Sequence, residues 1–141
     1  MRILLAVLLS LIPLSAHAES LGELSANPYE SDSTANPFGG GSPFEPDGIN
    51  NQFSPYGSPF SNQSATNPFA TDAPRLYDQQ GQYRGKLSTN PYDADSTSNP
   101  SGRYGSPFFQ DSIHNPYGAG SPYRPDSPIN PYGRGLRIEG R

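Results

Sequence analysis

The chain has 141 residues, a formal net charge of −4 and no cysteine. Without cysteine it can form neither disulfides nor a thiolate metal site, so an exported disulfide scaffold is excluded. The acidic balance also lacks the clustered lysines and arginines of a nucleic-acid-binding surface, so we expect no nucleic-acid partner.

Residues 1–18 predict a secretory signal peptide. A basic start at Arg2 precedes an apolar run over residues 3–12, and Ala16-His17-Ala18 forms an A-x-A cleavage site. The run is too short to span a bilayer. A buried N-terminal helix is disfavoured because the chain has no second apolar helix on which to pack it. We therefore expect an exported protein, periplasmic or secreted, whose mature chain begins at Glu19 and has no membrane span.

The mature composition favours a chain with little aliphatic core. Leu, Ile and Phe together make up 16 of the 123 residues from Glu19 to Arg141. That share lies below the roughly 20% at which a disordered chain is suspected. However, the nine tyrosines and seven phenylalanines recur at regular positions, whereas disordered segments are usually poor in aromatic residues.

Charge is unevenly divided along the mature chain. Residues 19–72 hold seven acids and no Lys or Arg, while residues 73–141 hold eight bases and six acids. Drift in solvated loops explains this division. Complementarity between the halves, within one chain or between chains, is the alternative, and it would permit self-association.

The mature chain repeats itself. "GELSANPYESDSTANPFG" from Gly22 returns as "GKLSTNPYDADSTSNPSG" from Gly85, and "GSPFEPDGINN" from Gly41 returns after a one-residue slip as "GSPFFQDSIHN" from Gly105. Such self-similarity indicates two copies of one structural unit. We assign residues 19–78 to the first copy, residues 79–82 to a hairpin turn and residues 83–141 to the second copy.

Each copy contains three versions of a twelve-residue word, Asn/Ser-Pro-Tyr/Phe-x-x-Asp-Ser-x-x-Asn-Pro-Tyr/Phe. The six words begin at Asn27, Ser42, Ser58, Asn90, Ser106 and Ser121. Ser101 stands where one word should have its second aromatic residue. Because the word recurs as a whole, we interpret it as a unit of structure.

The residue types of the word predict a turn. Asn or Ser before Pro is extended, and its side chain can close an Asx or Ser turn. The Asp at position six is expected to cap one short helical turn, which the later Asn-Pro would end. The aromatic residues at positions three and twelve are expected to pack on each other and on proline. The predicted structural residues, including the glycine of the hairpin, are Pro28, Tyr29, Pro43, Phe44, Pro59, Phe60, Gly81, Pro91, Tyr92, Pro107, Phe108, Pro122 and Tyr123.

Strands are expected in the segments between words. The copies open with residues 21–25 and 83–88 and close with residues 75–77 and 137–139. Residues 78–81, Asp-Gln-Gln-Gly, suit a four-residue hairpin loop in which Gly81 has positive φ. The predicted fold class is a small all-β or irregular protein, a turn-rich two-copy repeat around a short four-stranded sheet, with disorder of part of the chain left open.

These words give the mature chain a resemblance to a group of short exported bacterial proteins. That group carries strings such as "LSxNPYxxDSxxNPYG" and ends in "GxxIxG". This chain has "LSANPYESDSTANPFG" from Leu24, "LSTNPYDADSTSNPSG" from Leu87, where Ser101 replaces the usual second aromatic residue, and "GLRIEG" from Gly135. The resemblance implies export and a turn-repeat architecture, and it implies no activity.

The sequence offers little for catalysis. His114 is the one histidine after residue 18; a Ser-His-Asp triad is weighed against a polar turn residue, and the turn residue is favoured. We expect no enzyme activity and no cofactor. Turn-forming aspartates also resemble hard-oxygen calcium ligands, although a capping role explains them as well. The weak calcium candidates are Asp32, Asp47, Asp95, Asp111 and Asp126.

The interpretation that follows is an exported, non-enzymatic structural or adhesive protein of the bacterial envelope or exterior. Tyrosine combines apolar area with a polar tip, so the repeated words suit contact with a protein or glycan. The alternative is a disordered polypeptide, rich in Pro, Asn and Tyr, that orders on a partner or on calcium.

Overall fold

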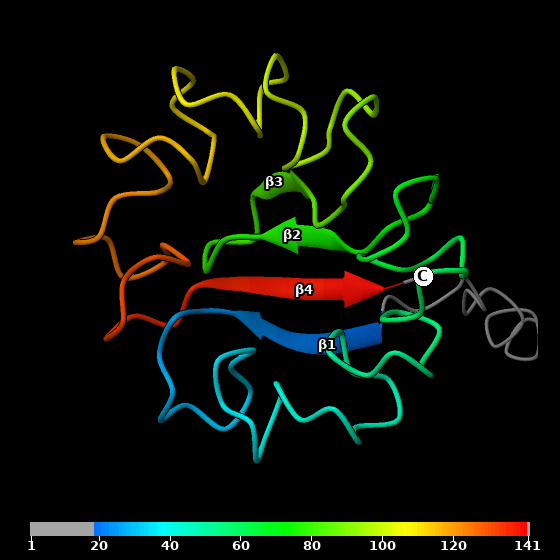
Figure 1. Ribbon diagram of the computed structural model, residues 1–141. Coiled ribbons are helices and arrows are strands. Elements are labelled where there is room, and N and C mark those ends of the chain that lie inside the picture. Colours follow the sequence, from blue (N-terminus) through cyan, green and yellow to red (C-terminus); the bar gives the residue numbers. More distant parts are fainter. Residues whose placement is uncertain (1–18, 141) are drawn as a thin grey trace, which may run out of the picture.

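The computed structural model describes residues 19–140, so the expected signal peptide and its cleavage site lie outside the described residues. Four strands form one antiparallel sheet: β1 (Glu19–Leu24), β2 (Arg75–Tyr77), β3 (Tyr83–Lys86) and β4 (Leu136–Gly140), in the order β1-β4-β2-β3 (Figure 1). The expected all-β class with a four-stranded sheet is confirmed. No part of the described chain is helical, so none of it is a helix that could cross a bilayer.

The hairpin between β2 and β3 is as expected. Its loop is closed by a hydrogen bond from the N–H of Asp78 to the carbonyl of Gln82 (2.9 Å). Gly81 has a φ of 87°, a conformation that costs little only for glycine. The carboxylate of Asp78 also accepts the N–H groups of Gln80 and Gln82, which fixes the loop.

The strand order interleaves the beginning and end of the chain. β1 pairs with β4, β2 pairs with β3, and β2 and β4 lie side by side at the centre (Figure 1). The strand that opens each predicted copy therefore pairs with the strand that closes the other. At the centre Leu76 lies opposite Ile138, the residue at the same place in the other copy.

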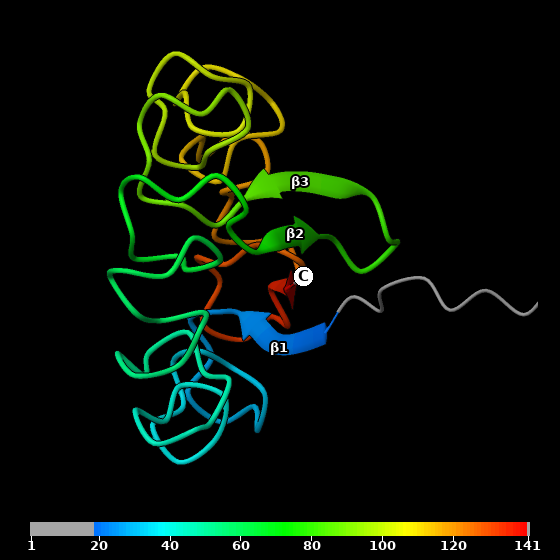
Figure 2. The ribbon, with the colours of Figure 1, turned by 90° about the vertical axis from the view of Figure 1, so that its right-hand side faces the viewer.

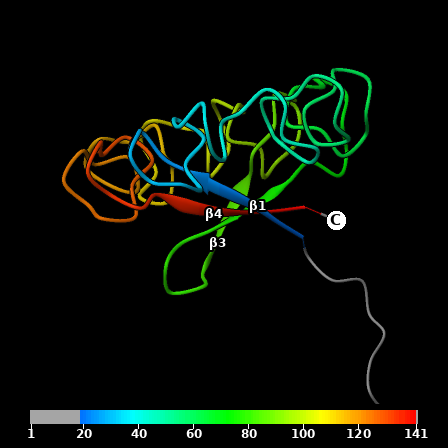
Figure 3. The ribbon, with the colours of Figure 1, turned by 90° about the horizontal axis from the view of Figure 1, so that it is seen from below.

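The turn segments lie over one face of the sheet (Figures 2 and 3). The turn segments of the first predicted copy begin beyond the β1 edge and those of the second begin beyond the β3 edge (Figure 1). Hydrogen bonds from Ser25 and Asn27 to Gly133, and from Asn90 to Ala70, place the end of each series beside the start of the other. The apolar core lies between the sheet and these segments. It consists of Leu21, Ile49, Tyr56, Ala65, Leu76, Leu136 and Ile138, with Leu24, Leu87 and Ile113 partly buried against it.

The opposite face of the sheet carries polar and aromatic side chains. Arg75 lies opposite Glu139, and Tyr77 lies opposite Arg137, whose guanidinium is 5.8 Å from the centre of the tyrosine ring. The ring of Tyr83 adds to this layer at 5.8 Å from that of Tyr77. The sheet thus has one core face and one face of partly exposed rings and charges.

Candidate functional site

The twelve-residue words are built from side chains that bond to their own backbone. In each word the oxygen of the first side chain accepts a hydrogen bond of 3.0–3.2 Å from the N–H of the third residue. The accepting residues are Asn27, Ser42, Ser58, Asn90, Ser106 and Ser121. The expected Asx and Ser turns are therefore confirmed in all six words.

The asparagine at position ten joins two parts of its word. Its Oδ1 accepts the N–H two residues later at 2.9–3.0 Å. Its Nδ2 donates to the carbonyl of the fourth residue at 2.8–3.2 Å. The residues are Asn36, Asn51, Asn67, Asn99, Asn115 and Asn130. The amide supplies the acceptor and the donor from two separate atoms, so one asparagine side chain holds both backbone groups.

The expected helical turn capped by Asp at position six is wrong. In every word the N–H of the seventh residue bonds to the carbonyl of the fourth at 3.0–3.2 Å, which closes a β-turn. The capping side chain is the serine at position seven, whose Oγ accepts the N–H of the ninth residue at 2.9–3.2 Å. These serines, Ser33, Ser64, Ser96, Ser112 and Ser127, are fully buried. Gly48 takes this position in the second word.

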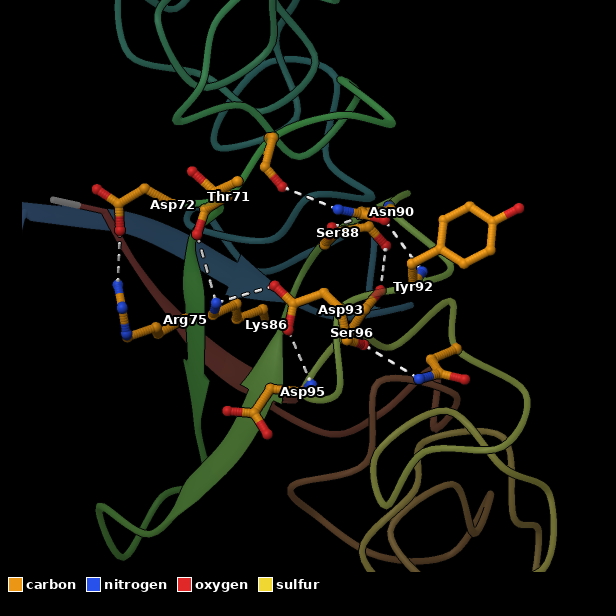
Figure 4. Close-up of polar contacts among 12 residues, drawn as sticks. Thr71, Asp72, Arg75, Lys86, Ser88, Asn90, Tyr92, Asp93, Asp95 and Ser96 are labelled. Carbon is orange, nitrogen blue, oxygen red and sulfur yellow. Dashed lines mark hydrogen bonds and ion pairs between the residues drawn. The ribbon is translucent and has the colours of Figure 1, made fainter.

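The aromatic residues of the words point outward, so the expected packing of position three on position twelve is wrong. Eleven rings at these positions are 83–95% exposed. They belong to Tyr29, Phe38, Phe44, Phe53, Phe60, Phe69, Tyr92, Phe108, Tyr117, Tyr123 and Tyr132. Figure 4 shows the ring of Tyr92 directed away from the polar contacts around it. The turns are closed by backbone hydrogen bonds between residues three apart. They place the small side chain of serine on the inside, where an aromatic ring does not fit.

We call these eleven rings the aromatic array. Each ring except that of Phe53, which follows Gln52, comes after a proline whose φ is fixed. The N–H of every ring residue is bonded to the Asn or Ser two positions before it. The backbone that carries each ring is therefore held in one conformation. Apolar rings in such numbers on a surface are typical of a contact site.

The weak calcium candidates occupy different environments. Asp95 accepts the hydroxyl of Tyr83 at 3.0 Å. Asp111 pairs with Arg84 and Arg103, and Asp126 pairs with Arg124. Asp32 and Asp47 line a pocket beside β1. Within residues 19–140 no three acidic or histidine side chains are placed to share a metal ion.

His114 lies in a turn word. Its ring Nε2 is 2.8 Å from the carbonyl oxygen of Thr97. Its backbone N–H donates to Oγ of Ser112. Neither partner is a carboxylate, so the arrangement is that of a polar turn residue and does not orient the imidazole as a general base.

The sequence interpretation missed a buried ionic network. Arg84, on β3, is 8% exposed and donates to Oδ2 of Asp78 at 3.0 and 3.2 Å. The N–H groups of Gln82 and Gln80 and the guanidinium of Arg84 outweigh burial and lower the pKa of Asp78. Beside this network, burial and the hydrogen bond to Asp95 raise the pKa of Tyr83. The sequence indicated this network through Asp78, the residue that opens the hairpin loop.

No protein-family model matches this chain, and no curated protein or solved structure matches it either. The resemblance to short exported bacterial proteins therefore stays a prediction.

Proposed function

We propose that this chain is an exported, non-enzymatic protein that makes structural or adhesive contacts with a protein or glycan at the bacterial envelope or outside the cell. The observation that carries the proposal is the aromatic array. Each solvated ring is available for contact, and a tyrosine or phenylalanine buried on binding contributes much area for few immobilised torsions. The capped turns support the same conclusion, because a surface already held in its binding conformation loses less entropy on association.

The proposal includes the two-copy architecture, with residues 19–78 and 83–141 as equivalent units. An isolated bridge joins Glu23 to Ser33 in the first unit, and another joins Lys86 to Ser96 at the corresponding place in the second. Repeated units present the same group several times, so weak contacts made by single words would add up through multivalency.

The test compares two variants of the mature chain in co-sedimentation with the envelope fraction of its native cells. One variant replaces three rings of the second copy (Tyr92→Ser, Phe108→Ser, Tyr123→Ser). The matched control replaces three exposed polar residues (Thr89→Ala, Gln80→Ala, Gln82→Ala). We expect the ring variant to bind more weakly, the control to bind as the unaltered chain does, and both to keep the same urea midpoint. Equal binding by both variants would overturn the proposal.

The alternative, a disordered chain that orders on a partner or on calcium, predicts a different observation. Circular dichroism of the mature chain would then show no ordered structure alone and a change on adding calcium. A cooperative urea transition without calcium excludes this alternative.

A further inference from the structure

A pocket of about 340 Å³ opens beside β1 in the first copy. Its walls include Gly22 on β1, Gly40 in the linker between the first two words, and the acidic residues Asp32, Glu45 and Asp47. It lies apart from the aromatic array, and the two copies differ there.

In the second copy the corresponding place is filled by a tyrosine. Gly85 matches Gly22 in the sequence repeat, and both have positive φ. A Cβ on Gly85 would lie 2.6 Å from Cγ of Tyr104, whereas a Cβ on Gly22 would meet only the main chain of Asp32. Tyr104 is 7% exposed and packs its ring edge-on against Tyr83.

The linkers explain the difference. The second copy has Gly102-Arg103-Tyr104-Gly105 where the first has Gly39-Gly40-Gly41, which is one residue shorter and has no side chains. The first copy therefore lacks both the ring that covers the glycine of the strand and the arginine before it.

The pocket retains the counterparts of two carboxylates that have partners in the second copy. In the second copy Asp95 accepts the hydroxyl of Tyr83, and Asp111 pairs with Arg84 and Arg103. Their counterparts in the first copy are Asp32 and Asp47, whereas Ser20 and Leu21 stand in place of Tyr83 and Arg84. No cation among residues 19–140 pairs with Asp32 or Asp47.

Asp47 instead interacts with another carboxylate, that of Glu19. A hydrogen bond to Asp47 raises the pKa of Glu19, with burial and the charge of Asp47 adding to the effect. Two neighbouring carboxylates are a favourable place for an incoming guanidinium, which would supply a positive charge and several N–H donors.

We infer that this pocket binds an arginine–tyrosine segment of a partner protein, with the ring against Gly22 and the guanidinium on Asp47. The segment would repeat, between molecules, the contact that Arg103 and Tyr104 make within the second copy. This inference deepens the proposed function and rests on it in taking the partner to be a protein.

The test is an NMR titration of the mature chain with the hexapeptide Ser-Gly-Arg-Tyr-Gly-Ser, the sequence of residues 101–106. We expect saturable shifts of the amides of Gly22, Gly40 and Gly48. Peptides with glutamine for arginine, or alanine for tyrosine, should each bind about tenfold more weakly, because each loses one charge-assisted or ring contact. Shifts elsewhere, or equal binding of the three peptides, would overturn the inference.

Three protein variants locate the site. Asp47→Asn keeps the size of the side chain and should weaken peptide binding about tenfold, whereas Asp126→Asn, at the same position of a word in the second copy, should not. Replacing Gly39-Gly40-Gly41 by Gly-Arg-Tyr-Gly should fill the pocket and abolish binding. If that graft does not fold, the two Asp variants decide, and equal binding by both contradicts the proposal.

The same titration separates this inference from the proposed function. The triple ring variant of the second copy leaves the pocket intact, so it should bind the peptide normally while losing binding to the envelope. If Asp47→Asn loses peptide binding but binds the envelope as the unaltered chain does, then the pocket binds the peptide and takes no part in the envelope contact.

Discussion

Leu76 lies directly opposite Ile138 on the two central strands, and both side chains are completely buried. β2 closes the first predicted copy and β4 closes the second, so this contact joins the two halves of the chain. Few aliphatic side chains are available elsewhere in the core, so these two should matter more than their number suggests.

Leu76→Ala should therefore lower the free energy of unfolding by about 2–5 kcal/mol, because removing the buried methyl groups leaves a cavity in the core. Urea unfolding followed by tyrosine fluorescence measures the change. The matched control is Ile129→Ala, in which the isoleucine is 52% exposed, with an expected loss below about 1 kcal/mol. Similar losses in both variants would mean that the central pair is not the core.

The exposed rings lead to the opposite expectation. Phe108→Ala and Tyr92→Ala should each change the free energy of unfolding by no more than about 0.5 kcal/mol, since neither ring has a packing partner to lose. Ser101→Tyr should be equally neutral. The same urea titration checks all three. A loss of several kcal/mol in Phe108→Ala would restore the ring-packing interpretation that the exposed positions contradict.

Asn67 should contribute strongly although it lies in a turn. It is 9% exposed, donates to the carbonyl of Ser61 at 2.9 Å and accepts the N–H of Phe69 at 3.0 Å. Asn67→Ala leaves both backbone groups unpaired and should cost about 1–3 kcal/mol. Asn67→Asp loses the donor and sets a carboxylate oxygen against the carbonyl oxygen of Ser61, so its cost should be at least that of Asn67→Ala. Thermal unfolding of the three proteins gives this order, and Phe69→Ala, at an exposed ring, serves as the control.

Stability should fall in acid partly through Asp78. Its pKa is lowered in the folded state from a usual value of 3.8, so the native state binds this proton more weakly than the unfolded chain does. The stabilisation is complete above pH 3.8 and is lost as the pH falls through the lowered pKa.

Asp78→Asn should cost about 1.5–3 kcal/mol at neutral pH, because it removes the charge that pairs with Arg84. It should also flatten the loss of stability between about pH 5 and pH 2. Urea midpoints measured across this range test both effects. Glu30→Gln, at an exposed position, should leave the profile unchanged, and a profile in Asp78→Asn as steep as in the unaltered chain would contradict the assignment.

The sequence by itself determined the local structure of this protein. Asn or Ser before Pro defined where each turn begins, because the side chain caps its own backbone and the proline fixes φ. Gly81 marked the hairpin by its tolerance of positive φ, and the segments between words marked the strands, with Arg75–Tyr77 agreeing in both limits. These features depend on contacts between residues close in the chain, which a local pattern records.

Only the tertiary structure decided which residues face inward and which segments meet. The rings are apolar, which predicted that they form the core. In the structure the hydrogen-bonded turns place Ser and Asn at the inner positions, and the rings are exposed to solvent. The pairing of β1 with β4, the ion pair of Arg84 with Asp111, and the walls of the pocket beside β1 all join residues distant in sequence. Such contacts follow from how the two halves pack together, and no local pattern along the chain specifies them.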